Sequence, residues 1–180
     1  YSYEVYSEGV LNLDECTVTN GVLKADSSAS KALILDNLEV LGYETAEKIY
    51  GMAKDGLPVV FAGKLPSSVM GSDAEYTGSV RGTDAALQKV LADTLALDNV
   101  AQVSSMNELF AWLDAQGIQA NASYDQKNVR VNLHEDTDGS RYYYLYNDNA
   151  ETIQVELSLA GTGVPYLMNA WTGEVSPIAC

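Results

Sequence analysis

Polar side chains that could bind a ligand follow each of two apolar runs in the first half of the chain. Asp36 and Asn37 end one run, and Lys64 comes two residues after the next. Open α/β folds bind ligands at the carboxyl ends of their parallel strands, where a carboxylate and an amide could hold sugar hydroxyls. We therefore expect Asp36 and Asn37 to end a central strand and to face a crevice that Lys64 also lines. The alternative is that both side chains bond nearby backbone amides in a turn between a strand and a helix.

Aromatic side chains are concentrated in the last quarter of the chain. The run 142–146 holds four tyrosines, Tyr144 among them, and puts aromatic rings on both faces of a predicted strand, while Trp171 lies in a loop between two strands. Exposed rings could stack on the C–H faces of sugars, which makes Tyr144 and Trp171 candidates for carbohydrate contact. The alternative is packing, with one face of the tyrosine strand in a core and Trp171 as a plug over the end of a sandwich.

His134 is the only histidine, and it stands directly before Glu135 and Asp136. A histidine beside carboxylates could act as a general acid or base. It could equally be a residue at a strand end whose ring is hydrogen-bonded. A small enzyme would need His134 to lie near Asp36 in space, beside the long segment 63–82, which has no regular periodicity.

The sequence lacks the common motifs of catalysis and of metal or nucleotide binding. It has no G-x-S-x-G elbow, no phosphate-binding G-x-x-x-x-G-K-[ST] loop and no G-x-G-x-x-G fingerprint. The segment 136–139 lacks the spacing of a calcium loop and is interpreted as a hairpin turn. One histidine and two cysteines are too few for a zinc finger. We therefore expect no catalytic residues, no metal and no cofactor in this chain.

The composition restricts the partners of the protein. The chain has 180 residues, of which 47% are hydrophobic and 19% are charged, and its formal net charge is −15. Such a surface repels phosphate backbones and anionic membrane surfaces, and no apolar run approaches the roughly 20 residues of a spanning helix. The expected partner is carbohydrate rather than nucleic acid or a membrane.

Three residues bear on the cellular compartment. Cys16 and Cys180 could form a disulfide worth about 4 to 5 kcal/mol in the chain-entropy model, or remain unpaired thiols. Asn121 begins an N-glycosylation sequon, Asn-Ala-Ser. With few lysines and an acidic composition, these features indicate a secreted, extracellular glycoprotein. Because the chain begins with Tyr1 and shows no signal peptide, we expect a processed or excised chain.

Residues 1–121 are predicted to form an α/β domain with an N-terminal hairpin. Asn20 and Gly21 suit the turn of a hairpin over 16–25, followed by a polar loop over 26–30. Periodicity then predicts alternating strands and helices: strands at 32–36, 58–62 and 99–103, and helices at 44–54, 83–95 and 105–115. This alternation is typical of an open, mostly parallel, three-layer sheet of the flavodoxin kind.

Residues 122–180 are predicted to form a small antiparallel β-sandwich or meander. Short alternating runs, separated by turn signals such as Asp138-Gly139, predict five strands at 129–133, 141–146, 152–159, 164–168 and 174–178. Alternation of apolar and polar residues indicates a sheet with one face exposed.

Several of these stretches together resemble a known family. The segments are KALILD (31–36), GLPVVFAG (56–63), VRVNLH (129–134), RYYYLYN (141–147) and GTGVPYLMNAWTGE (161–174). They resemble the C-terminal part of large secreted glycoside hydrolases similar to the α-L-rhamnosidases of glycoside hydrolase family 106. The resemblance implies a glutaminase-like α/β domain followed by a β-sandwich, both downstream of a catalytic barrel.

The sequence departs from that family because the catalytic barrel, with its acid and base glutamates, has no counterpart here. The resemblance therefore implies a C-terminal fragment, released by proteolysis or expressed separately. It would be a non-catalytic accessory or scaffold region whose partner is the missing upstream catalytic domain, in a parent acting on plant or cell-wall polysaccharide. The alternative function is a stand-alone carbohydrate-binding module that uses the strand from Tyr142 to Tyr146 together with Trp171.

Overall fold

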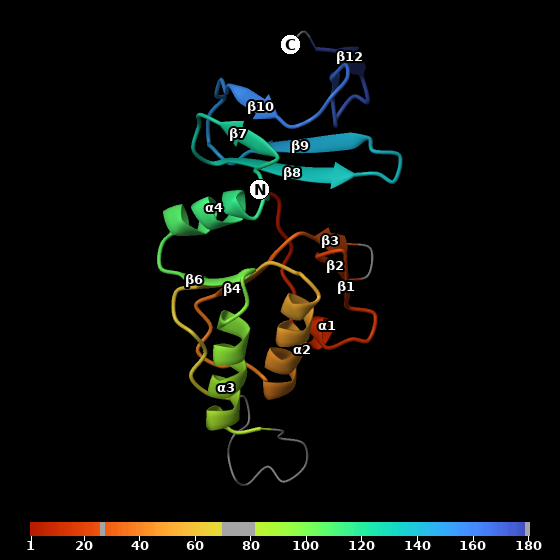
Figure 1. Cartoon of the computed structure of the whole chain (residues 1–180). Helices are drawn as coiled ribbons and strands as arrows, with labels where there is room; N and C mark the ends of the chain where they lie inside the picture. Colours follow the sequence, from red (N-terminus) through yellow and green to blue (C-terminus); the bar gives the residue numbers. More distant parts are fainter. Residues whose placement is uncertain (26–27, 70–81, 179–180) are drawn as a thin grey trace. The chain divides into compact units, whose positions relative to one another are not determined.

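The computed structural model describes residues 1–25, 28–69 and 82–178. The chain divides into two compact units, which are described separately. The α/β unit consists of Tyr3–Gln119, and the β unit consists of Tyr1–Ser2 together with the chain from Ala120 onwards. The protein is thus a mixed α/β protein in which a parallel sheet occurs with several small antiparallel sheets (Figure 1).

A parallel sheet forms the centre of the α/β unit. Its strands are β4 (Leu33–Asp36), β5 (Val59–Ala62) and β6 (Val100–Val103), in the order β4-β5-β6. The expectation of a central strand before Asn37 is therefore wrong, because β4 lies at the edge of the described sheet and β5 is its middle strand. The edge position exposes Ile34 by 43%, whereas Leu33 and Leu35 are buried.

Three helices cover this sheet, and the periodicity predicted each of them to within a residue or two. They are α2 (Tyr43–Lys54), α3 (Asp84–Leu95) and α4 (Met106–Ala115). The hydroxyl of Thr83 caps α3 by accepting from the Ala86 N–H at 3.2 Å, and Ser105 caps α4 in the same way at 3.3 Å from the Glu108 N–H.

The core of the α/β unit lies on both faces of the parallel sheet. Val59 and Phe61 belong to one apolar cluster with buried residues of α2 and α3, such as Ile49 and Leu91. The intervening Val60 faces the opposite side and packs in a second cluster with Leu109 and Leu113 of α4. Because helices cover both faces, Val59, Val60 and Phe61 of β5 are all buried, which explains why this strand is apolar throughout.

The N-terminal region forms an antiparallel sheet of β1 (Thr17–Thr19), β2 (Val22–Ala25) and β3 (Ser28–Ser30). The hairpin predicted at Asn20-Gly21 is confirmed: both residues have positive φ, 52° and 73°. The loop predicted for 26–30 is wrong in part, since Ser28–Ser30 pair with β2, while residues 26 and 27 lie outside the described residues. Small polar residues carry little strand signal of their own, so pairing with β2 determined the conformation of this segment.

A short helix, α1 (Glu8–Leu11), was not predicted from the sequence. The Glu8 carboxylate accepts hydrogen bonds from the Gly42 N–H at 2.9 Å and from the Thr45 hydroxyl at 2.6 Å. Helix α1 is therefore held by contacts with the start of α2, more than thirty residues away, and a helix of this length has almost no periodicity to read.

In the described part of the β unit, residues 1–2 and 120–178, the strands form three two-stranded antiparallel sheets. The pairs are β7 (Ala122–Tyr124) with β10 (Leu157–Leu159), β8 (Val129–Glu135) with β9 (Arg141–Asn147), and β11 (Tyr166–Met168) with β12 (Val175–Pro177). Because β7 pairs with β10 rather than with its neighbour in the chain, the described pairing is not a simple meander. Strand β7 was not predicted, and of the strand predicted over 152–159 only Leu157–Leu159 is formed.

The described part of the β unit buries few side chains. Val129 is the one residue there with a buried side chain, whereas the α/β unit has two apolar clusters. Small β structures of this kind bury a low fraction of their surface. Large apolar side chains therefore remain in contact with solvent, and where they lie decides what this unit can bind.

Candidate functional site

The carboxyl ends of β4 and β5 meet, as the sequence predicted. The backbone N–H of Asn37 donates to the Ala62 carbonyl at 2.7 Å, and its Oδ1 accepts from the Lys64 N–H at 3.4 Å. A Cβ built on Gly63 would lie 2.9 Å from Asn37 Oδ1, so glycine allows this close approach. The turn therefore brings Asn37, Gly63 and Lys64 together.

The end of the third strand, β6, adds residues that the sequence did not predict as site residues. Gln102 Nε2 donates to the Gly63 carbonyl at 2.8 Å. The Ser104 N–H and hydroxyl donate to Glu108 Oε2 at 2.7 and 2.9 Å, and these bonds lower the pKa of the Glu108 carboxyl. The segment Ser105-Met106-Asn107-Glu108 has the residue types of a capping box at the start of a helix, and here the Glu108 side chain bonds Ser104, the residue before the cap.

At these strand ends, the amide side chains of Asn37 and Gln102 bond backbone groups of the protein itself. Asn37 bonds a backbone amide, as expected for a turn residue, and Gln102 bonds a backbone carbonyl. The side chains of Asp36, Asn37 and Lys64 are exposed. The start of the predicted loop 63–82 runs beside the segment after β4, where the Ser67 N–H donates to the Glu39 carbonyl at 2.9 Å. Residues 70–81 of this loop lie outside the described residues.

A second candidate lies on the hairpin of β8 and β9. The register places three tyrosines on one face of β9, each opposite a polar residue of β8: Tyr142 with His134, Tyr144 with Asn132, and Tyr146 with Arg130. The tyrosines are 48%, 63% and 50% exposed. We call these six residues the tyrosine face.

Tyr143 has a different role from the other tyrosines of the strand. Its side chain lies on the opposite face of β9 and is half-buried. Its hydroxyl donates to the Asn121 carbonyl at 3.2 Å and also contacts the Ala160 carbonyl. The run therefore contains one tyrosine that packs and three whose rings face solvent. The sequence alone did not show which tyrosines belong to which group.

Polar contacts hold the residues around the tyrosine face. His134 Nε2 lies 3.1 Å from Asp136 Oδ1, and its ring centroid is 6.3 Å from that of Tyr142. Arg130 Nη2 donates to Asp148 Oδ2 at 2.8 Å. His134 is therefore a strand residue with a hydrogen-bonded ring. His134 belongs to the β unit, whereas Asp36 belongs to the α/β unit. The two residues of the predicted enzyme site therefore lie in different compact units.

Trp171 occupies the turn between β11 and β12. The Asn169 side chain accepts from the backbone N–H groups of Trp171 and Thr172 at 2.9 and 3.2 Å, which fixes the turn. The indole is 97% exposed, so the interpretation of Trp171 as a plug over the sandwich end is wrong. Its sheet is not the one that carries the tyrosine face, and the structure does not join Trp171 to Tyr144 as one site.

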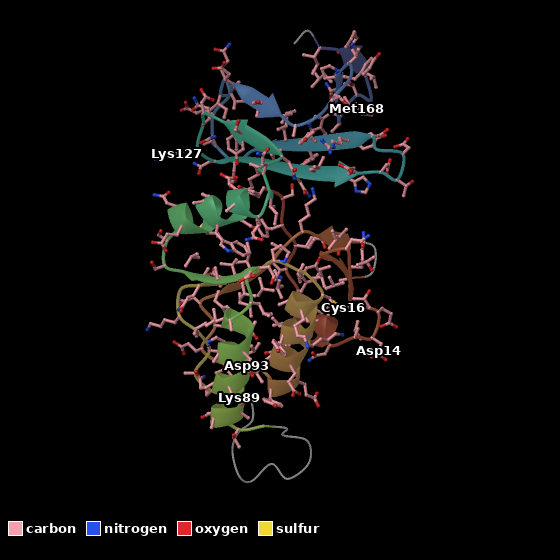
Figure 2. All side chains as sticks on the ribbon, viewed as in Figure 1. Asp14, Cys16, Lys89, Asp93, Lys127 and Met168 are labelled. Atoms are coloured by element: carbon pink, nitrogen blue, oxygen red, sulfur yellow. The ribbon has the colours of Figure 1, made fainter. Side chains whose placement is uncertain are left out.

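The remaining candidates concern covalent chemistry. Cys16, labelled in Figure 2, is buried beside β1, and burial raises the pKa of its thiol. Its predicted partner Cys180 lies outside the described residues, so the disulfide stays a prediction. Asn121 precedes β7, is half-buried and lines a cavity of about 280 Å³ together with Tyr1, Tyr124 and Val131. Glycosylation of Asn121 also stays a prediction.

The described residues contain no cluster of three or more His, Cys, Asp or Glu side chains that could hold a metal ion. Within the same part of the chain, no helix combines the length and the apolar character needed to cross a membrane. Comparison of the chain with protein-family models, with curated proteins and with solved structures found no match.

Proposed function

We propose that the chain is a non-catalytic accessory region that binds carbohydrate, and that the tyrosine face is its contact surface. The observation that carries this proposal is the alternation of Tyr142, Tyr144 and Tyr146 on one exposed face of β9. Three rings at strand spacing form a row that follows an extended oligosaccharide, since alternate residues of a strand repeat about every 7 Å.

The polar partners across the hairpin suit the edges of a sugar ring. Asn132, opposite the central Tyr144, offers an amide that can both donate to and accept from hydroxyls. With a formal charge of −15, the protein repels polyanionic polysaccharides at a distance. The preferred ligand in this proposal is therefore a neutral oligosaccharide.

The origin of the chain belongs to the same proposal and rests on the sequence motifs alone. Their resemblance to the family 106 α-L-rhamnosidases supports a secreted glycoside hydrolase as parent, with a glutaminase-like, three-layer α/β region beside the carbohydrate-binding unit. The catalytic domain upstream would be the partner of this region in the same polypeptide. Trp171, whose indole is 97% exposed, is a second carbohydrate contact in the alternative form of the proposal, a stand-alone binding module.

The test is calorimetric titration with neutral rhamnose-containing oligosaccharides, compared with pectic fragments that carry uronates. We expect saturable binding that Tyr144→Ala weakens roughly tenfold, since an aromatic contact contributes about 0.5–1.5 kcal/mol. The matched control is Tyr166→Ala, which removes a tyrosine exposed to a similar degree on β11.

Binding that both variants weaken equally would show that the tyrosine face is not the site. The absence of heat with every oligosaccharide would contradict carbohydrate binding and leave the scaffold role. A glycosidase assay on this chain is expected to be blank in either case.

A further inference from the structure

Strand β9 has an outer edge whose backbone groups point away from β8. The Leu133 N–H on β8 donates to the Ser2 hydroxyl at 3.0 Å, so odd-numbered residues of β8 direct their backbone away from β9. At the ends of the hairpin, Asp148 N–H donates to the Asn128 carbonyl and Asp136 N–H to the Ser140 carbonyl. Even-numbered pairs therefore exchange the hydrogen bonds between the strands. The N–H and carbonyl groups of Tyr143 and Leu145, which lie opposite odd-numbered residues, face outwards.

This edge is long and, apart from the charge of Arg141 at its start, lacks the sequence features that usually block strand pairing. In the described residues β8 is the one strand that pairs with β9. The seven residues of β9 include no proline, no glycine and no lysine. Its alternate side chains Tyr144 and Tyr146 are at least half exposed. Natural proteins generally protect such edges, because an open edge is a template for another strand.

The sequence of β9 is complementary to itself. In an antiparallel pair centred on Tyr144, Tyr142 of one copy lies opposite Tyr146 of the other, and Tyr143 lies opposite Leu145. At the ends, Arg141 lies opposite Asn147. Arg141 is the only charged residue of the strand, so this register contains no pair of like charges. Two copies with a formal charge of −15 each repel one another at low salt, but this register brings no carboxylate of β9 against another. The self-complementary register of the strand is what favours a second copy as the partner.

We propose that β9 pairs antiparallel with β9 of a second copy of this chain, with Tyr144 at the twofold axis. The outward N–H and carbonyl groups of Tyr143 and Leu145 form the new ladder, and the two hairpins become one four-stranded sheet, β8-β9-β9-β8. The joined edges are smaller than a standard protein interface, so the dimer is weak and depends on protein concentration.

The twofold axis at Tyr144 stands perpendicular to the sheet. Both tyrosine faces then lie on the same side, and the row of three rings from one copy lies beside the row from the other. This consequence, unlike the dimer itself, rests on the proposed carbohydrate-binding function. Two linked faces would bind a long polysaccharide more tightly than short oligosaccharides, through effective concentration.

Sedimentation equilibrium on the whole chain, from micromolar to millimolar concentration, tests the dimer with Leu145→Pro. Because the Leu145 N–H points away from β8, proline removes an edge donor without removing a hydrogen bond of the hairpin. We expect the native chain to dimerise with concentration and Leu145→Pro to stay monomeric. Leu145→Ala, which keeps the N–H, should dimerise like the native chain. A native chain that is monomeric throughout, or a Leu145→Pro variant that dimerises like Leu145→Ala, would overturn the proposal.

Disulfide trapping tests the register and does not depend on how well the proline variant folds. In the proposed pair the two Tyr144 positions form a non-hydrogen-bonded pair with Cα atoms about 4.5 Å apart, within reach of a disulfide. In a Cys16→Ala, Cys180→Ala background, Tyr144→Cys should give a covalent dimer on mild oxidation. Tyr142→Cys should crosslink with Tyr146→Cys in a mixture and far less with itself. Crosslinking without this position dependence, or none at any position, would contradict pairing through β9.

Discussion

At the scale of single residues, Asn37 shows why the end of β4 has its conformation. Its φ of 50° lies in the left-handed region, which most residues with a Cβ avoid. Asparagine adopts this region more readily than most residues, and here its side-chain oxygen also accepts from the Lys64 N–H, 27 residues along the chain. The Asn37 amide oxygen thus bonds the protein's own backbone. A residue that the sequence suggested as a ligand-binding residue serves instead to turn the chain.

A substitution of Asn37 tests this role. We expect Asn37→Val to lower the free energy of unfolding by about 1–2 kcal/mol, because a β-branched residue is strained at positive φ and cannot bond the Lys64 N–H. Urea denaturation followed by far-UV circular dichroism measures the difference. The control is Asn37→Gly, which adopts positive φ without strain and should lose much less. Equal losses for both variants would mean that the backbone conformation is not what asparagine provides here.

At the scale of elements, the start of α4 shows how a helix end and a strand end share the same groups. Ser105 caps the first turn, and the Glu108 carboxylate reaches back to the Ser104 N–H and hydroxyl at the end of β6. These bonds hold the pKa of the Glu108 carboxyl below its usual range, and the bond from the Ser104 backbone N–H contributes most. A carboxylate in the first turn is also favoured by the helix dipole.

The lowered pKa predicts how the stability of α4 depends on pH. A carboxyl whose pKa is lower in the folded than in the unfolded state stabilises the fold above its unfolded pKa, and this contribution disappears as the pH falls through the folded pKa. We expect Glu108→Gln to be less stable than the native chain at neutral pH and to match it in strong acid. Denaturant unfolding over that range checks this. A stability difference that persists unchanged into acid would show that charge is not the cause.

At the scale of the whole molecule, the excess of acidic residues is the dominant electrostatic feature. The chain has 25 Asp and Glu against 10 Lys and Arg. Among the described residues, ion pairs such as Lys89–Asp93 at 2.7 Å, one turn apart on α3, are exposed and contribute little to stability (Figure 2). Most of the negative charge therefore has no cation to balance it, and it repels itself in the folded state.

This imbalance predicts how salt and pH change the melting temperature. We expect Tm to be lowest at mildly alkaline pH and low salt, where the carboxylates are ionised and unscreened, and to rise when salt is added. Calorimetry at mildly acidic and mildly alkaline pH, with and without salt, measures both effects. Sodium chloride and potassium chloride should act alike, because screening depends on ionic strength. A Tm that responds to neither salt nor pH would mean that the charges are too far apart to interact.

The sequence by itself determined the features that arise from neighbouring residues. Helices α2, α3 and α4 follow from apolar spacing and from caps such as Thr83, and the first hairpin follows from Asn20 and Gly21. The meeting of Asn37 with Lys64 also followed from sequence, because parallel strands bring their carboxyl ends to one edge. The helix and hairpin preferences act within one or two turns of chain, so they can be read without knowing the fold. The contact between Asn37 and Lys64 joins residues 27 apart, and it follows from the parallel pairing of two successive strands.

Only the tertiary structure decided which strand lies at an edge and which side chains face solvent. The place of β4 outside β5, the pairing of β7 with β10 and the exposure of Trp171 depend on contacts between distant segments. The tyrosine run is the clearest case, since its alternation was visible but its exposed face was not. Which face of a strand is buried depends on what packs against it, and local sequence does not encode that. In this chain Tyr143 reaches the Asn121 carbonyl, and its neighbours Tyr142 and Tyr144 therefore face solvent.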